Sequence, residues 1–321
     1  FRILMKPLHV LHVDENHPIL IEELQKLGFN NELAYSTPLE VLLPQLHKYT
    51  GIVIRSRFPI DQQVIDAASN LKFIARLGAG LENIDLTYAE KKKIQLFAAP
   101  EGNRNAVAEH ALGMLLSLMN KLRLGHISIQ NGQWLREEHR GWELEGKTVG
   151  IIGYGNTGRQ FAKKLAGMEV KTLCYDIREG LGDEYATQVN MDTLLLKAEV
   201  ISLHLPQDES TMGLINKRFI SKVAHPIWLL NTSRGKIVDT EALVEGLKTG
   251  KVLGAGLDVL EYESRSFSNT FEKNNYPSAL RYLLNAENVL LSPHVGGWTH
   301  ESHLKLATTI IDKIKTNFLK L

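Results

Sequence analysis

The stretch "VGIIGYGNTGRQFAKKL", Val149 to Leu165, decides the fold of this chain. Its opening run is apolar, and its second half is charged, with apolar residues recurring at helical spacing. Between the halves lie three glycines, Gly153, Gly155 and Gly158. A short apolar run, a glycine turn and an amphipathic segment are typical of a strand followed by a helix in a parallel sheet.

The same alternation extends in both directions. From Lys147 onward, apolar runs such as "EVISLHLP", "PIWLLNTS" and "ENVLLSP" are separated by helical segments, and a shorter series starts at Leu8 with "LHVLHV", "GIVIRS" and "LKFIARLG". Runs apolar on both faces indicate parallel sheets covered by helices on both sides. We therefore predict an α/β protein with two doubly wound parallel-sheet domains, a Rossmann domain at 103–295 and a smaller flavodoxin-like domain. The smaller one is expected to be discontinuous, 5–102 plus 296–321, because the tail is a long amphipathic helix.

Residues 105–124 form a predicted helix that is apolar nearly all round. Such a helix must be buried, either in a core or against a second subunit. We predict a dimer interface here, with burial in the core as an equal alternative.

Composition excludes several classes of function. The 321 residues contain 37 Lys and Arg against 36 Asp and Glu, without the basic patch of a nucleic-acid-binding protein. The longest uncharged apolar run, 111–119, is about half of what a membrane span needs. No secretory signal precedes the first strand, and the single cysteine, Cys174, fits a reducing compartment, so a cytoplasmic location is expected. Residues 1–4 precede Met5 and are excluded from the fold argument.

The glycine loop predicts a dinucleotide site rather than a bare turn, because an acidic residue follows at the expected distance. Gly153 permits the tight turn, Gly155 allows the backbone to approach a pyrophosphate, and Gly158 allows close packing of helix and strand. Asp176 ends the next strand, where a carboxylate binds the ribose hydroxyls and repels a 2′-phosphate. We therefore expect NAD rather than NADP, although Arg178 lies two positions further on.

Three chemically suitable residues follow three predicted strands. Arg234, Glu263 and His294 come after "IWLLNTS", "GAGLDVLEY" and "ENVLLSP", and the carboxyl ends of parallel strands share one sheet edge. Reduction of a 2-oxo acid requires a cation for the carboxylate and carbonyl, which suits Arg234, and a proton donor, which suits His294. Glu263 would orient the imidazole. Each residue alone could be an ordinary charged surface residue. Only the occurrence of all three at strand ends indicates a catalytic site.

The motifs "RLGAGLENIDL", "GYGNTG", "NTSRGKIVD", "GAGLDVLEYES" and "SPHVGGWT" together resemble the D-2-hydroxyacid dehydrogenase family over nearly the whole chain. Within it the chain is most similar to phosphoglycerate dehydrogenases without a regulatory domain. The resemblance implies the same catalytic trio, a homodimer, an active site in an interdomain cleft, and a small anionic 2-hydroxy acid substrate. It also implies that backbone of the first domain grips the substrate carboxylate, around Leu77, Gly78, Ala79 and Gly80. The implied cofactor-binding positions are Gly153, Tyr154, Gly155, Asn156, Thr157, Gly158, Asp176, His204, Asn231, Thr232, Ser233, Asp258 and Gly296.

The substrate itself is less sharply predicted. Our leading expectation is 3-phosphoglycerate, as in serine biosynthesis, with Arg55 and Arg57 binding the phosphate. Arg136 and Arg140 could assist, but an exposed surface role is favoured for both. Two departures from the family pattern bear on specificity: Ser264 replaces a usual proline, opening a long segment at 264–288, and Trp298 stands where a small residue is common.

Three alternatives remain open from the sequence. Glyoxylate or hydroxypyruvate reduction and D-lactate chemistry are alternatives within the same enzyme class. An NADH-sensing regulatory protein, like the corepressors that resemble this family, is the alternative from another class. No metal is expected, because His300 and His303 lie one helical turn apart without a third ligand.

Overall fold

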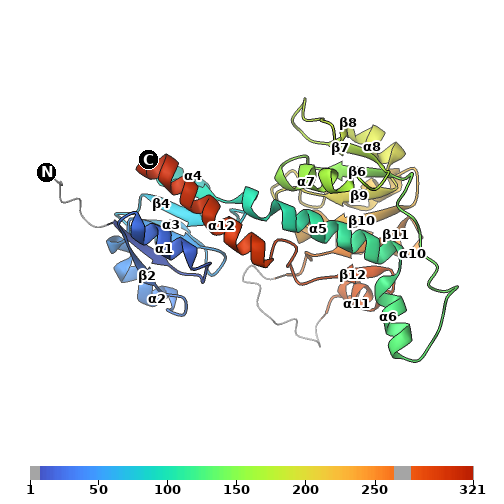
Figure 1. Ribbon diagram of the computed structural model, residues 1–321, viewed down its shortest axis with the longest axis horizontal. Coiled ribbons are helices and arrows are strands. Elements are labelled where there is room, and N and C mark those ends of the chain that lie inside the picture. The colour runs from blue at the N-terminus through green and yellow to red at the C-terminus, as the bar shows by residue number, and fades with distance from the viewer. Residues whose placement is uncertain (1–7, 264–275, 321) are drawn as a thin grey trace. The chain divides into compact units, whose positions relative to one another are not determined.

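A computed structural model describes residues 8–263 and 276–320 (Figure 1). The chain divides into two compact units: residues 1–103 with 298–321 form unit 1, and 104–297 form unit 2. Residues 1–4, and the first part of the long segment after Glu263, lie outside the described residues. Within the described ranges, no helix has the length and apolarity needed to cross a membrane.

Unit 1 contains a five-stranded, fully parallel sheet. Its strands are β1 (Leu8–His12), β2 (Phe29–Leu33), β3 (Gly51–Ile54), β4 (Phe73–Arg76) and β5 (Gln95–Ala98), in the order β2-β1-β3-β4-β5. This is the flavodoxin-like order, in which the chain reverses direction across the sheet between β1 and β3. Its helical segments are α1 (Ile19–Lys26), α2 (Leu39–Leu42), η1 (Leu43–Lys48), α3 (Gln62–Ala67), α4 (Leu86–Lys91), α12 (His300–Lys313) and η4 (Ile314–Leu319).

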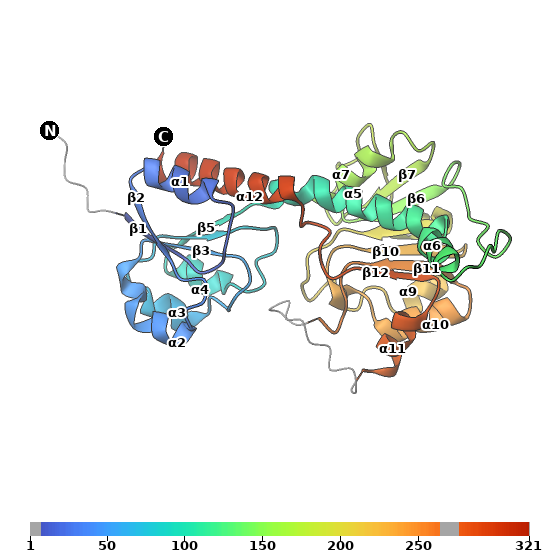
Figure 2. The same cartoon turned by 60° about the horizontal axis from the view of Figure 1, so that its bottom comes forward.

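Successive strand residues of unit 1 point to opposite faces, and each face is covered by helices. On one face Ile52 and Ile74 pack with α2, α3 and α4, whereas on the other Val53 and Phe73 pack with α1 and α12. Two views show α12 beside α1 (Figure 1, Figure 2). Lys313 fixes α12 further by donating to the Ala98 carbonyl at 2.7 Å. The C-terminal helix is therefore a structural part of the N-terminal unit.

Unit 2 contains a seven-stranded parallel sheet in the order β12-β11-β10-β9-β6-β7-β8, which is the Rossmann arrangement with an added strand. The strands are β6 (Thr148–Ile152), β7 (Lys171–Tyr175), β8 (Thr187–Gln188), β9 (Val200–Leu203), β10 (Ile227–Asn231), β11 (Val252–Leu257) and β12 (Val289–Leu291). Its helical segments are α5 (Pro100–Met119, beginning in unit 1), α6 (Leu122–Gln130), α7 (Asn156–Leu165), α8 (Met191–Lys197), α9 (Lys217–Lys222), η2 (Gly235–Ile237), α10 (Thr240–Lys248) and α11 (Ser278–Asn285).

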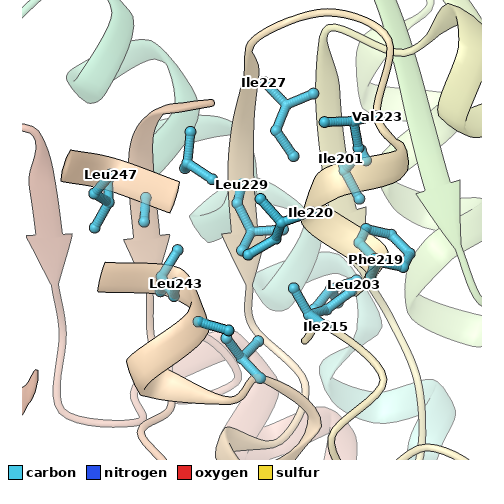
Figure 3. Packing of buried hydrophobic residues seen from close by; sticks show 14 of the residues in the cluster. Ile201, Leu203, Ile215, Phe219, Ile220, Val223, Ile227, Leu229, Leu243 and Leu247 are labelled. Carbon is cyan, nitrogen blue, oxygen red and sulfur yellow. The ribbon is translucent and has the colours of Figure 1, made fainter. Parts of the chain in front are cut away.

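Helices also cover both faces of this second sheet. The strands bury Ile201 and Leu229 against α8, α9, α10 and α11 on one face (Figure 3). They bury Ile151 and Cys174 against α5 and α7 on the other. Burial raises the pKa of the Cys174 thiol to about 11, in keeping with a small hydrophobic role.

The apolar helix predicted at 105–124 is divided in the structure. α5 ends at Met119, and Lys121 adopts a left-handed conformation with φ 50° before α6 begins. The prediction of one continuous helix was therefore wrong, because apolar periodicity does not reveal a backbone reversal at a lysine. Ala108, Ala111 and Leu115 of α5 are fully buried in the core of unit 2.

Candidate active site

The turn between β6 and α7 contains the three glycines, and each lacks a side chain for a different physical reason. Gly153 has a positive φ of 92°, and a Cβ there would lie 2.3 Å from the His204 carbonyl oxygen. A Cβ on Gly158 would lie 2.0 Å from the Gly153 carbonyl oxygen. Packing within the unit therefore requires both. A Cβ on Gly155 meets nothing within 4 Å, so this glycine borders open space.

The N-terminus of α7 faces the same open space. Asn156 and Thr157 begin this ten-residue helix, and Gly155 precedes it without a side-chain cap. Uncapped N–H groups and the positive end of the helix dipole favour a bound phosphate group. The Tyr154 side chain points into the protein, because its hydroxyl donates to Asp183 at 2.7 Å and the side chain is buried.

Asp176, at the end of β7, is held as a carboxylate beside the glycine loop. It accepts the Tyr154 N–H at 2.8 Å and the N–H and Nε of Arg178 at 3.0 and 3.1 Å. Burial alone would raise the pKa of Asp176, but the hydrogen bonds from Arg178 and Tyr154 outweigh it and leave the pKa below its usual value. A negative charge therefore lies where a ribose hydroxyl would be bound.

Two buried polar atoms at the same sheet edge have no hydrogen-bond partner in the described part of the chain. They are Nδ1 of His204, which follows β9, and Oγ1 of Thr232, which follows β10. His204 uses its other nitrogen on Ser202 Oγ at 2.9 Å, and burial lowers the pKa of His204 to about 3, so the ring is neutral. Buried polar atoms usually have partners, so these two are positioned for an outside ligand. Together with the glycine loop and Asp176, they fit a dinucleotide.

The turn after β10 places Arg234. The buried Asn231 accepts the Ser233 N–H at 3.1 Å and its hydroxyl at 2.8 Å, and donates to the Arg234 carbonyl at 2.9 Å. A Cβ on Gly235 would lie 2.0 Å from the carbonyl oxygen of Leu260, so this turn contacts the loop leading to Glu263. The side chains of Asn231 and Ser233 therefore shape the turn.

Arg234, Glu263 and His294 follow three neighbouring strands at one sheet edge. Asn231 of β10 is paired with Leu257 of β11, which is paired with Leu291 of β12. The structure brings two of the three side chains into direct contact. Nδ1 of His294 lies 3.1 Å from Oε2 of Glu263, and both side chains are about one-quarter exposed.

The backbone of His294 is in the left-handed region, with φ 55°, which a residue with a side chain seldom adopts. Its N–H donates to the carbonyls of Asp258 and Ser292, at 2.8 and 3.0 Å. An unusual conformation held by two backbone hydrogen bonds at a sheet edge indicates a functional position.

Asp258 fastens the loop that carries His294. Its buried carboxylate accepts the Ser292 hydroxyl at 2.5 Å and the N–H groups of Val295 and Gly296 at 2.9 and 2.8 Å. His110 Nε2 lies 3.4 Å away and 2.9 Å from Ser292 Oγ. Burial would raise the pKa of Asp258, but the hydrogen bonds from His110, Ser292 and the backbone hold it below its usual value. Asp258 and Gly296 therefore position the His294 loop.

Sequence analysis did not identify His110 and Ser292 as members of this network. For His110, a polar residue inside an apolar helix could have been taken as a signal.

In unit 1, the loop after β4 contains the four predicted carboxylate-binding positions. The N–H groups of Leu77 and Gly78 donate to the carbonyls of Ile54 and Arg76. The N–H groups of Ala79 and Gly80 have no acceptor among the described residues. These last two are the donors suited to a carboxylate.

Arg55 and Arg57 follow β3, but the structure uses them differently. The Arg57 guanidinium donates to the carbonyls of Val13, Ala34 and Thr37, which holds the loops after β1 and β2. The Arg55 guanidinium instead stacks on Trp298, with Cζ 3.9 Å from the ring centroid. Arg55 is therefore the member of the pair with donors to offer an anion.

The fold and this sheet edge define a Rossmann-type dinucleotide-binding protein. Residues 112–296 match the family described as "D-isomer specific 2-hydroxyacid dehydrogenase, NAD binding domain", so the chain belongs to this family. The predicted fold class, family and NAD cofactor are confirmed.

Several known proteins are similar to the chain. D-3-phosphoglycerate dehydrogenase of Archaeoglobus fulgidus is 36% identical over 92% of this chain and 54% of that protein. Hydroxypyruvate reductase of Thermotoga maritima is 33% identical over 94% of both. The crystal structure of D-lactate dehydrogenase from Aquifex aeolicus complexed with NAD and lactic acid has a TM-score of 0.82 at 27% identity, covering 97% of this chain and 95% of that one. The chain spans about half the length of the Archaeoglobus fulgidus phosphoglycerate dehydrogenase.

Proposed function

We propose that this protein is an NAD-dependent dehydrogenase that interconverts a D-2-hydroxy acid and its 2-oxo acid. The observation that carries the proposal is the contact between His294 and Glu263 at the edge of the NAD-binding sheet. These residues follow β12 and β11, and β11 pairs with β10, the strand that precedes Arg234. An imidazole oriented by a carboxylate beside a guanidinium is the set of groups that carbonyl reduction needs.

Each residue has a distinct role in this proposal. The planar guanidinium of Arg234 binds the substrate carboxylate and polarises the carbonyl oxygen. His294 donates a proton to the developing alkoxide from the ring nitrogen that does not face Glu263. Glu263 fixes the tautomer of the imidazole and stabilises the imidazolium. The N–H groups of Ala79 and Gly80 bind the carboxylate. When bound, the cofactor would supply the hydride as NADH or accept it as NAD⁺.

The glycine loop, Asp176, His204 and Thr232 would hold the cofactor. Asp176 disfavours a 2′-phosphate because it is a partly buried carboxylate, which three hydrogen-bond donors hold in its negatively charged form.

We propose 3-phosphoglycerate and 3-phosphohydroxypyruvate, the pair used in serine biosynthesis, as the leading substrates. Similarity to phosphoglycerate dehydrogenases supports this choice, as does Arg55, whose guanidinium stacks on Trp298 and has no acidic partner in the part of the chain that the structure describes. Hydroxypyruvate, glyoxylate and D-lactate chemistry are the alternatives, since relatives with these names also match. We place the reaction in the cytoplasm.

The experiment that tests the function is NADH oxidation with 3-phosphohydroxypyruvate, hydroxypyruvate, glyoxylate and pyruvate, repeated with NADPH. We expect turnover with NADH, and a preference of about a hundredfold for the phosphorylated acid. Tight NADH binding without turnover of any acid would instead indicate a sensor.

We also propose a homodimer. The interface predicted at 105–124 is placed instead on α6 and residues 131–142, because α5 is largely buried in the core of unit 2. Leu122, Ile129, Trp134 and Trp142 are large apolar side chains that are more than half exposed. Beside them, a hollow of about 580 Å³ lies between this segment, α5 and the ends of β11 and β12. Exposed apolar side chains that gather in one segment favour association between protein molecules. Analytical ultracentrifugation should show a dimer for the natural chain and a monomer for Ile129→Glu.

A further inference from the structure

Trp298 and Arg55 form a stacked pair at the sheet edge of unit 1. The guanidinium carbon lies 3.9 Å from the indole centroid, within the range of a cation–π contact. Trp298 is itself braced by His303, whose ring centroid is 5.1 Å away, and His303 contacts His17 at 5.5 Å. The indole is thus one member of a cluster of aromatic rings in tilted and edge-on contact, rather than an isolated surface residue.

The backbone below Arg55 is fixed as well. Oδ2 of Asp14, after β1, accepts the N–H groups of Arg55, Ser56 and Arg57 at 2.6, 3.1 and 3.4 Å. The loop after β3 is therefore tied to the end of β1, the place where this sheet changes winding direction. In open α/β sheets, ligands bind at this point.

The guanidinium of Arg55 is half-buried, and no carboxylate or carbonyl binds it within the described residues. Burial lowers the pKa of Arg55, with Asp14 acting in the opposite direction, but an arginine remains charged. A stacked guanidinium has one face covered and keeps its edge donors available for a planar or tetrahedral anion. Arg57, whose donors are engaged by carbonyls, lacks this property.

We propose that Trp298 is a specificity-determining residue, which holds Arg55 as the receptor for a second anionic group of the substrate, remote from the reacting carbon. This inference rests on the proposed function. It assigns the substrate to 2-oxo acids with a distal phosphate or carboxylate. The phosphate is favoured, because its two charges and three terminal oxygens match the donors on the guanidinium edge.

The test compares kcat/KM, with NADH, for 3-phosphohydroxypyruvate and hydroxypyruvate, which differ only in the phosphate. Trp298→Leu keeps apolar bulk without a π face, whereas Trp298→Phe keeps the face. We expect the ratio of the two values to fall about tenfold in Trp298→Leu and about a hundredfold in Arg55→Met. In Trp298→Phe this ratio should stay within about threefold of its value in the natural chain. The same measurement with 2-oxoglutarate separates a carboxylate receptor from a phosphate receptor.

Equal losses for both substrates in Trp298→Leu, or an unchanged ratio in Arg55→Met, would overturn the proposal. A second readout does not depend on turnover: titration with inorganic phosphate should change the tryptophan fluorescence of the natural chain and leave that of Trp298→Phe and Arg55→Met unchanged. If no 2-oxo acid is reduced, the proposed function fails while this titration still tests the anion site. An identical phosphate response in all three proteins would reject the site itself.

Discussion

The two sheet edges of this molecule treat their charged residues in opposite ways. At the edge of the seven-stranded sheet, charges are paired within the protein: His294 with Glu263, and Asp258 with four donors. At the edge of the five-stranded sheet, Arg55 rests on an indole ring with no acidic partner among the described residues. Internal pairing holds in one geometry the groups that transfer a proton in the proposed reaction. A cation without an acidic partner of its own is instead available to bind an anionic group of a ligand.

Among the variants that test this comparison, replacement of His294 should have the largest effect on kcat. We expect His294→Ala to lower kcat about a hundred- to ten-thousandfold, because no other group at this edge replaces the proton donor. The Kd for NADH should stay within threefold, which equilibrium titration measures. A variant that keeps more than a tenth of the natural kcat would remove His294 from the mechanism.

Loss of the Glu263 charge should have the next largest effect. Glu263→Gln keeps the shape but not the charge, and hydrogen bonds to charged groups contribute about 1.5–3 kcal/mol, so kcat should fall about ten- to hundredfold. Glu261→Gln is the matched control. Glu261 lies in the same loop but binds Thr240 at 2.7 Å, so its loss should leave kcat unchanged. Equal losses in both variants would show that the loop, and not the charge, matters.

The preference for NADH over NADPH tests the role of Asp176, another charged residue that is paired within the protein. Asp176→Ala should narrow the preference for NADH over NADPH by about tenfold or more, because the buried charge that repels a 2′-phosphate is gone and Arg178 is released. In the double variant with Arg178→Ala, the gain toward NADPH should disappear. Comparison of kcat/KM for the two cofactors provides the measurement. An unchanged preference in Asp176→Ala would count against its role.

The smallest expected effect is on stability and comes from the neutral His204. Its pKa of about 3 in the folded protein lies below the ordinary value of 6.5, so only the unfolded chain takes up the proton in the interval between them. The contribution of His204 is complete well above pH 6.5 and is lost as the pH falls. Between pH 6.5 and 5.5 the natural chain should lose about 1 kcal/mol of unfolding free energy more than His204→Gln does, as measured with urea. Parallel pH dependences would contradict the burial of a neutral ring.

Much of the fold could be predicted because the buried strands are apolar on both faces. β2, β5 and β8 were not predicted, since they lie at the edges of their sheets. β2 exposes most of its polar "FNNEL", β5 is only the four residues "QLFA" with Gln95 exposed, and β8 has only two residues. The glycine loop was predicted because a tight turn, an open approach and close packing each demand glycine at a fixed position.

The parts of the site that depend on distant contacts could not be predicted. His110 and Ser292 are far apart in the sequence and meet only through Asp258. Likewise, Arg55 and Arg57 look equivalent in "IRSRF", and only the folded loops decide that carbonyls bind one and an indole covers the other.

The most direct test of the central claim measures kcat/KM for 3-phosphohydroxypyruvate and hydroxypyruvate in the natural chain, His294→Gln and Arg55→Met. If His294 transfers the proton and Arg55 binds the distal phosphate, His294→Gln lowers both kcat/KM values by the same large factor. Arg55→Met then lowers only the value for the phosphorylated acid. Equal losses for both acids in Arg55→Met, or near-normal turnover of either acid in His294→Gln, would contradict it.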